Sequence, residues 1–167
     1  MLSNSRAAHH PHNHDHCVAS ALERAQSLCQ QRNANLTPIR QQVLQILWES
    51  HVPLGAYQLI DRLSAANGKQ VAPPTVYRAI DFLLELGLIH RISSLNAFVG
   101  CPFPGLQHSD LFLICRNCNA TAEVANDNIN QMLLETSRKA GFALENQSLE
   151  LSGLCRQCQS EEGSRND

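Results

Sequence analysis

No part of the 167-residue chain is apolar for long enough to span a bilayer. Residues 1–17 are polar and rich in histidine, so they do not have the pattern of a secretion signal. The sequence also lacks a phosphate-binding loop, a His-Glu-x-x-His motif and an ordered Ser/His/Asp set, which are typical of common enzyme classes. These absences predict a cytoplasmic protein that does not enter a membrane, is not an enzyme and has no small-molecule substrate.

Charged residues are also scarce, at 17% of the chain, and the formal net charge is only −2. The hydrophobic fraction of 43% is enough for one domain or two small ones. Residues 1–91 carry eight basic and six acidic residues, whereas residues 92–167 carry five and nine. The first half is therefore the better candidate for a polyanionic partner, provided that its few basic residues share one face.

Cysteine, in contrast, is present seven times. Because no export signal is present, we expect reduced thiols rather than disulfides. Four of them form two Cys-x-x-Cys turns, at Cys115 and Cys118 and at Cys155 and Cys158. Four thiolates in a tetrahedron make a closed structural zinc site. The 36 residues between the turns exceed the usual zinc-ribbon spacing, so we expect a whole helix to be inserted there.

The first part of the chain predicts helices followed by a hairpin. Apolar residues recur at helical spacing, Thr37-Pro38 and Pro73-Pro74 are typical helix starts, and Gly87 is a typical helix stop. The expected helices cover residues 18–32, 37–49, 56–66 and 73–86, and the expected strands cover residues 88–92 and 97–101. This order predicts a winged helix-turn-helix domain over residues 18–101, after a disordered tail of residues 1–17.

A second module follows a hinge at residues 102–109, where two prolines and a glycine interrupt regular structure. The module covers residues 110–159, and residues 160–167 are expected to form a polar tail. Its predicted elements are strands at residues 110–114, 121–124 and 144–151 and a helix at residues 127–140 that Asp127 caps. The predicted class is α+β, with a winged-helix domain joined by the hinge to a small α/β dimerisation domain with a four-cysteine zinc site.

The fourth predicted helix is the candidate for insertion into the major groove of DNA. On its polar side, Arg78 can bind guanine through two hydrogen bonds, while Thr75 and Tyr77 can contact phosphates or thymine methyl groups. Tyr57 and Arg40 are further candidates for contacts with the DNA backbone or base edges. Any one of these residues could instead be an ordinary solvated side chain, but their combination with a predicted wing favours DNA binding.

Several segments resemble the ferric uptake regulator family, and most closely its zinc uptake regulator branch. The resemblance covers about residues 18–158 and includes the final Cys-x-x-Cys turn. It implies a homodimeric, metal-dependent repressor that binds double-stranded DNA at AT-rich inverted repeats upstream of zinc-uptake genes. The segments that carry it are Leu36-Thr37-Pro38-Ile39-Arg40, Pro74-Thr75-Val76-Tyr77-Arg78-Ala79-Ile80-Asp81-Phe82-Leu83, Gly87-Leu88-Ile89-His90-Arg91 and Leu113-Ile114-Cys115-Arg116-Asn117-Cys118.

The resemblance also implies a second, regulatory zinc site at His90, Cys101, His108 and Glu123, hence two zinc ions per chain. These residues supply two imidazoles, a thiolate and a carboxylate, which is a complete tetrahedral set. The thiolate favours zinc over iron because it is the softer ligand. Since the ligands come from the hairpin, the hinge and the second module, bound zinc is expected to fix the hinge and so the DNA-competent form of a dimer.

Two alternatives remain open. An iron- or peroxide-sensing member of the same family is the nearer one, but such members carry a histidine-rich run before the first Cys-x-x-Cys turn, where this chain has only His108 and, as a possible extra ligand, Asp110. The other is a zinc buffer or carrier, which would use the histidines of the N-terminal tail. A winged helix would serve no purpose in such a protein. These histidines are His9, His10, His12, His14 and His16.

Overall fold

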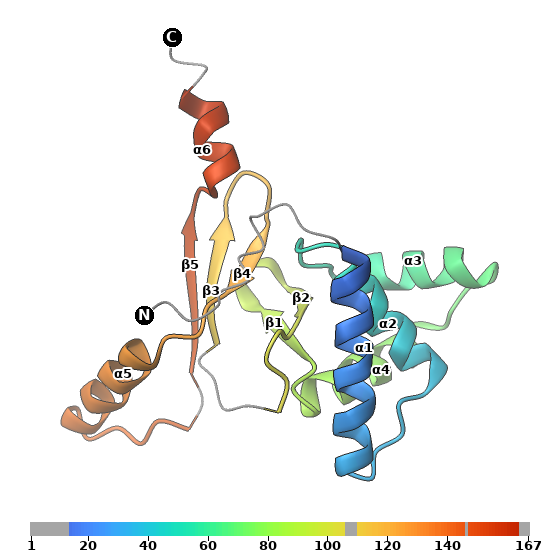
Figure 1. The fold of residues 1–167 in the computed structure, drawn as a ribbon, viewed down its shortest axis with the longest axis horizontal. Coiled ribbons are helices and arrows are strands. Elements are labelled where there is room, and N and C mark those ends of the chain that lie inside the picture. Colours follow the sequence, from blue (N-terminus) through green and yellow to red (C-terminus); the bar gives the residue numbers. More distant parts are fainter. Residues whose placement is uncertain (1–13, 106–109, 146, 164–167) are drawn as a thin grey trace. The chain divides into compact units, whose positions relative to one another are not determined.

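The computed structural model describes residues 14–105, 110–145 and 147–163. The chain divides into two compact units, one within Pro11–Leu106 and the other within Gln107–Asp167. Helices and small sheets occur in both parts of the chain, which confirms the predicted α+β class (Figure 1). Among the helices of these described ranges, none is long and apolar enough to cross a membrane.

The first unit contains four helices and a two-stranded antiparallel hairpin. In chain order these are α1 (His14–Gln31), α2 (Pro38–Trp48), α3 (Ala56–Asn67), α4 (Pro73–Glu85), β1 (Ile89–Ile92), a 3-10 turn (Ser93–Leu95) and β2 (Ala97–Gly100). Proline in the first turn of α2 and of α4 costs no helical hydrogen bond, because the first N–H groups of a helix have no partner within it. Gly68 and Gly87, with φ of +63° and +67°, follow the ends of α3 and α4, and the sequence predicts the stop at Gly87.

The core of this unit is formed by the apolar stripes of its four helices. Ala25, Leu59, Leu63, Val76 and Leu83 have no solvent exposure. Cys29 of α1 is also buried, and this burial raises the pKa of its thiol. The predicted helical faces are thus confirmed, and the polar side of α4 remains exposed.

The second unit is built on a three-stranded sheet with the order β4-β3-β5 (Figure 1). The central strand pairs antiparallel with one neighbour and parallel with the other. Parallel strands need a long crossover connection, and a helix lies in it, as the spacing of the cysteine turns predicts. The elements are β3 (Asp110–Cys115), β4 (Thr121–Glu123), α5 (Asp127–Lys139), β5 (Ser148–Gly153) and α6 (Arg156–Gly163).

Both predicted tails overlap helices. α1 begins at His14, so the last four residues of the predicted tail 1–17 are helical. α6 extends to Gly163, into the predicted polar tail 160–167. Both segments are rich in polar residues and lack an apolar stripe, so the sequence pattern gave no signal for a helix there.

Two details of the second unit also differ from prediction. The N-cap of α5 is Asn126 rather than Asp127, and its side-chain oxygen accepts hydrogen bonds from the backbone N–H groups of Asn128 and Ile129, at 3.1 and 3.3 Å. The last strand begins at Ser148, four residues later than expected. Its alternating pattern extends into the preceding connection, so the pattern alone could not mark where the pairing with β3 starts.

Candidate metal centre and nucleic-acid interface

The parallel pairing of β3 and β5 brings the two Cys-x-x-Cys turns together. Cys115 is opposite Gly153 in the register, and the N–H of Arg116 donates to the Gly153 carbonyl oxygen at 2.8 Å. Because parallel strands run in the same direction, the turns that follow them lie at the same edge of the sheet. Cys155 follows Gly153 by two residues, so it enters the cluster directly.

All four predicted sulfur ligands lie within 4.8 Å of one another, and no disulfide joins them. The sulfurs of Cys118 and Cys155 are 3.9 Å apart. A tetrahedral zinc site with bonds of about 2.3 Å to sulfur has edges of about 3.8 Å. The donor set and its spacing therefore fit a closed structural zinc site at Cys115, Cys118, Cys155 and Cys158.

Hydrogen bonds to sulfur support the thiolate form of Cys115. Burial raises the pKa of this thiol, but backbone N–H groups of Cys155, Cys118 and Asn117 outweigh the effect and lower the pKa to about 6. The N–H of Cys155 donates to the Cys115 sulfur at 3.3 Å. Bonds of this kind favour the charged form of a ligand and also hold it in place.

Cys158 shows the opposite behaviour. The Asn117 amide, which donates to its sulfur at 3.3 Å, lowers the pKa, but burial and hydrogen bonds with the three other thiols raise it to about 12. Four thiols this close cannot all lose their protons without a cation to offset the repulsion of the thiolates. A zinc ion would supply that positive charge, so the electrostatics agree with the sulfur geometry.

Two further candidate metal ligands lie on the hairpin of the first unit. His90 of β1 pairs with Val99 of β2, and Cys101 follows Val99 by two residues along the chain. Residues two apart on a strand share one face, so the imidazole and the thiol are diagonal neighbours. A ring nitrogen of His90 and the sulfur of Cys101 are within 4.8 Å of each other, and Cys101 is almost fully buried.

The other predicted regulatory ligands belong to the second unit or fall outside the described residues. Glu123 ends β4, pairs with Phe112 and is buried. His108 lies outside the described residues. Asp110 begins β3, but its side chain is not among those that the structure describes. Of the predicted set, His90 and Cys101 are thus brought together within one unit.

The predicted DNA-contacting residues of α3 and α4 are exposed. Thr75, Tyr77 and Arg78 lie in the first two turns of α4. Tyr57, in the first turn of α3, has 77% of its surface exposed. An exposed tyrosine of this kind has no packing role in its own unit, so it is available for a partner.

Arg40 is engaged within its own unit. Its guanidinium lies over the Phe82 ring, 3.5 Å from the ring centroid, and donates a hydrogen bond to the carbonyl oxygen of Asn35. The contact with Phe82 ties α2 to α4. The hairpin presents a basic residue that sequence reasoning missed: Arg91 is exposed and donates to Asn96 Oδ1 at 2.8 Å. Its position in the predicted strand 88–92 was the available signal.

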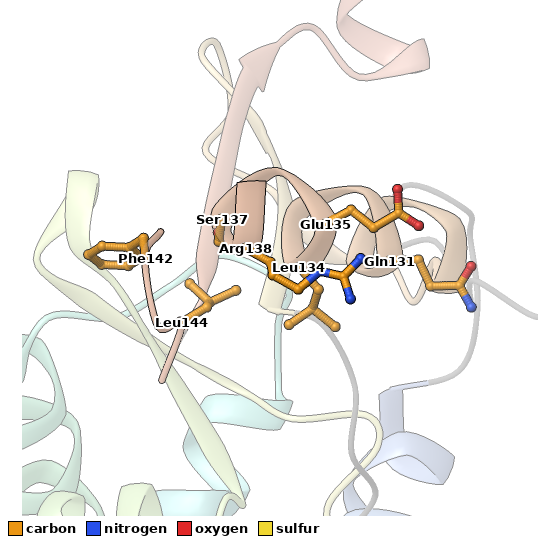
Figure 2. A pocket seen from close by; sticks show the side chains of 7 residues that line it. All are labelled: Gln131, Leu134, Glu135, Ser137, Arg138, Phe142 and Leu144. Carbon is orange, nitrogen blue, oxygen red and sulfur yellow. The ribbon is translucent and has the colours of Figure 1, made fainter. Parts of the chain in front are cut away.

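The helix α5 leaves apolar side chains exposed. Met132 is 68% exposed and Leu134 is 53% exposed. Beside them, a hollow of about 430 Å³ lies along the C-terminal half of the helix and the segment after it (Figure 2). Apolar surface of this kind is typical of a protein interface. The hollow is lined by Gln131, Leu134, Glu135, Ser137, Arg138, Phe142 and Leu144.

Comparison with known proteins agrees with this arrangement. The model of the ferric uptake regulator family matches residues 31–152. The zinc uptake regulation protein of Escherichia coli strain K12 is 39% identical over 138 residues, which cover 82% of this chain and 80% of that protein. The zinc uptake regulation protein of Mycobacterium tuberculosis strain H37Rv is 28% identical over 63% of this chain and 79% of its own length.

Two solved structures are similar over most of the chain. A zinc uptake regulator complexed with zinc and DNA has a TM-score of 0.80 and 35% identity, and the match covers 92% of this chain and 99% of that one. The holo form of XcZur has a TM-score of 0.77 and 38% identity over 86% of this chain and 99% of its own.

Proposed function

The chain belongs to the ferric uptake regulator family, and we propose that it is a zinc-responsive transcriptional repressor of zinc-uptake genes. The observation that carries the proposal is the presence of two separate donor sets. One is the closed cluster of four sulfurs, and the other is the pair His90 and Cys101 on the hairpin. A site that only maintains the fold needs the first set alone, so the second is available for sensing.

We propose that α4 enters the major groove of double-stranded DNA. Its exposed face carries Arg78, which can bind guanine through two hydrogen bonds, and Thr75 and Tyr77, which can contact phosphates or thymine. Tyr57 is positioned on α3 for a backbone contact, and Arg40 would act mainly by holding α2 against α4. The likeness to a zinc uptake regulator solved with zinc and DNA supports this use of the helices.

We further propose that the repressor is a homodimer on an AT-rich inverted repeat. Two recognition helices fit one duplex only when they lie about one helical turn apart, or a multiple of it, and an inverted repeat matches a dimer with two-fold symmetry. The exposed apolar residues Met132, Leu134 and Phe142 of the second unit support self-association, since a monomer would leave them in water.

The regulatory ligands that we propose are His90, Cys101, His108 and Glu123. One zinc ion would be bound by all four of these side chains. Ligands from the hairpin, the hinge and β4 would restrict the angle between the two units of each chain, and so the separation of the recognition helices in a dimer. Restriction to the DNA-competent form tightens DNA binding, and by linkage DNA tightens zinc binding.

The test is fluorescence anisotropy of a labelled AT-rich inverted-repeat duplex, with free zinc buffered over a series and ferrous iron as the comparison metal. Salt stays fixed, because contacts with phosphates make affinity steeply salt-dependent. We expect binding to tighten as free zinc rises, and Cys101→Ser to remove that response without loss of the structural zinc. The matched control is Cys17→Ser, which changes a thiol outside both donor sets.

Tight DNA binding without added zinc would mean that the second site is not regulatory. A stronger response to ferrous iron than to zinc would favour an iron sensor. Failure to bind any duplex at any zinc concentration would leave the buffer or carrier role. A Cys101→Ser protein that unfolds would contradict the separation of the two sites.

A further inference from the structure

The glycine that precedes Cys101 is in unusually close contact with the only tryptophan. Successive strand residues point to opposite faces, so Gly100 faces the helices while Cys101 points the other way. A Cβ atom at Gly100 would lie 2.3 Å from Nε1 of Trp48 and 2.4 Å from its Cε2. Non-bonded carbon atoms prefer separations of about 3.5–4.0 Å. Only glycine therefore allows β2 to lie this close to the indole.

The indole has little room to move away. Trp48 ends α2 and is buried, with 8% of its surface exposed. The guanidinium of Arg24, on α1, lies over the ring at 6.0 Å from its centroid. The ring is rigid, and both neighbouring helices belong to the packed core of the unit. A side chain added at Gly100 would therefore displace the strand rather than the tryptophan.

The strand is held at its other points as well. Leu54 and Phe98 exchange two backbone hydrogen bonds, of 3.0 and 2.9 Å, which attach β2 to the segment after α2. The N–H of Cys101 donates to the Leu88 carbonyl oxygen at 2.9 Å. The strand is thus fixed on both edges and packs against Trp48, so the backbone that carries the Cys101 thiol is held in place.

We propose that the contact between Trp48 and Gly100 is a positioning device that sets the Cys101 sulfur for zinc. The inference rests on the proposed function, because it assigns a role at the same site. Metal–ligand distances are held to about ±0.2 Å, so a strand that moves by several tenths of an ångström carries the sulfur out of range. Trp48 thus fixes a zinc ligand that it does not touch, from the opposite face of the strand.

The experiment compares the full-length wild-type protein with Gly100→Ala, the double variant Trp48→Leu/Gly100→Ala and the control Gly55→Ala. The control adds the same methyl group in the same unit, where the nearest atom, Gln58 Oε1, is 3.6 Å away. Competition with a zinc chelator measures affinity for the second zinc, while total metal content confirms that the structural zinc is retained.

We expect Gly100→Ala to weaken binding of the second zinc by about 10- to 100-fold, the cost typical of losing a group that orients a ligand. Removal of the indole in the double variant should restore affinity to within about threefold of wild type, because the added methyl group then has space. Gly55→Ala should bind like wild type. In the wild-type protein, the second zinc should also shift the emission of Trp48, and Cys101→Ser should abolish that shift.

The outcomes distinguish the positioning role of Trp48 and Gly100 from the proposed zinc-sensing function. Equal zinc affinity of Gly100→Ala and wild type would overturn the positioning role and leave the proposed function intact. A weakened Gly100→Ala protein that Trp48→Leu does not rescue would also overturn it, since the methyl group would then act by another route. If the wild-type protein retains only one zinc per chain, the proposed function fails and the positioning role fails with it.

Discussion

The two units of this chain are stabilised in different ways. In the first unit, every helix contributes side chains to one apolar core, and Leu59 and Leu63 are fully buried. In the second unit, α5 has no buried residue in the described structure, and a separate buried cluster is made of Cys115, Cys155 and Cys158. The first unit is stabilised by hydrophobic burial, whereas we expect the second to depend on a metal ion at its cysteine cluster.

The size of the second unit explains this dependence. A sheet of three short strands buries few side chains, of which Phe112 is the largest that is fully buried. Small units of this kind rarely gain enough from burial alone, so they use disulfides, metals or association. Here the cysteine cluster lies where β3 and β5 end, and α5 leaves apolar residues exposed.

The largest effect should follow from removing one structural ligand. Cys115→Ser should abolish ordered pairing of β3 and β5 while the helices of the first unit persist, because structural zinc contributes on the order of 10 kcal/mol to folding. Metal analysis and residue-level hydrogen exchange would measure this. Cys17→Ser is the matched control. Amides of β3 that stay protected from exchange in Cys115→Ser would contradict the dependence of the second unit on a metal ion.

The next effect should appear in the first unit and be independent of zinc. Leu63→Ala removes a fully buried side chain of α3 and should lower the free energy of unfolding by about 2–5 kcal/mol. Urea denaturation followed by Trp48 fluorescence measures it. Val52→Ala, at a site with 38% exposure, is the control and should change little. If chelation of zinc removed the loss of unfolding free energy caused by Leu63→Ala, the stability of the first unit would depend on zinc, contrary to the expected difference between the units.

A surface residue of the first unit should affect binding rather than stability. Arg78→Ala should weaken operator binding by about 1–3 kcal/mol, since a two-bond contact with guanine is lost. Its free energy of unfolding should stay within about 0.5 kcal/mol of wild type, because the side chain is exposed. Arg32→Ala removes the same charge at the end of α1 and should leave operator recognition in place. Equal losses of operator affinity in both variants would mean that Arg78 acts through its positive charge and not through a specific contact with guanine.

The smallest effect should come from the ion pair between Glu49 and Arg62. The two charged groups are 3.8 Å apart, and each side chain is about half exposed. Solvent screens such a pair, so Glu49→Gln should cost less than about 0.5 kcal/mol of unfolding free energy. Urea denaturation at low and high salt would measure this. A larger cost that high salt removes would mean that electrostatics add to hydrophobic burial in the first unit.

The sequence predicted the elements that have strong local signals. Pro38, Pro73 and Gly87 marked helix ends, and the spacing of apolar residues identified the buried faces of α1 to α4. The grouping of the four cysteines followed from their spacing alone. These features depend on neighbouring residues, so a local pattern was sufficient.

The rest depends on distant residues or on other molecules. The parallel register of β3 with β5 joins segments about 40 residues apart, and no local pattern specifies it. The exposure of α5 is a further example, because helical periodicity shows that a stripe is apolar, not which molecule covers it. For the same reason Gly100 gave no sign in the sequence that its hydrogen faces Trp48.

The register of β3 against β5 has a consequence for insertions and deletions. Each strand leads directly into a cysteine turn, so the cysteines can meet only when the two strands are paired in this register. A slip of one residue would turn every side chain of the slipped strand to the opposite face and would separate the sulfurs. A residue added in the connection between α5 and β5 leaves this alignment unchanged. A residue added between Leu151 and Cys155 would shift Cys155 relative to the paired strand. Insertions should therefore be tolerated before β5 but not between β5 and the cysteine turn.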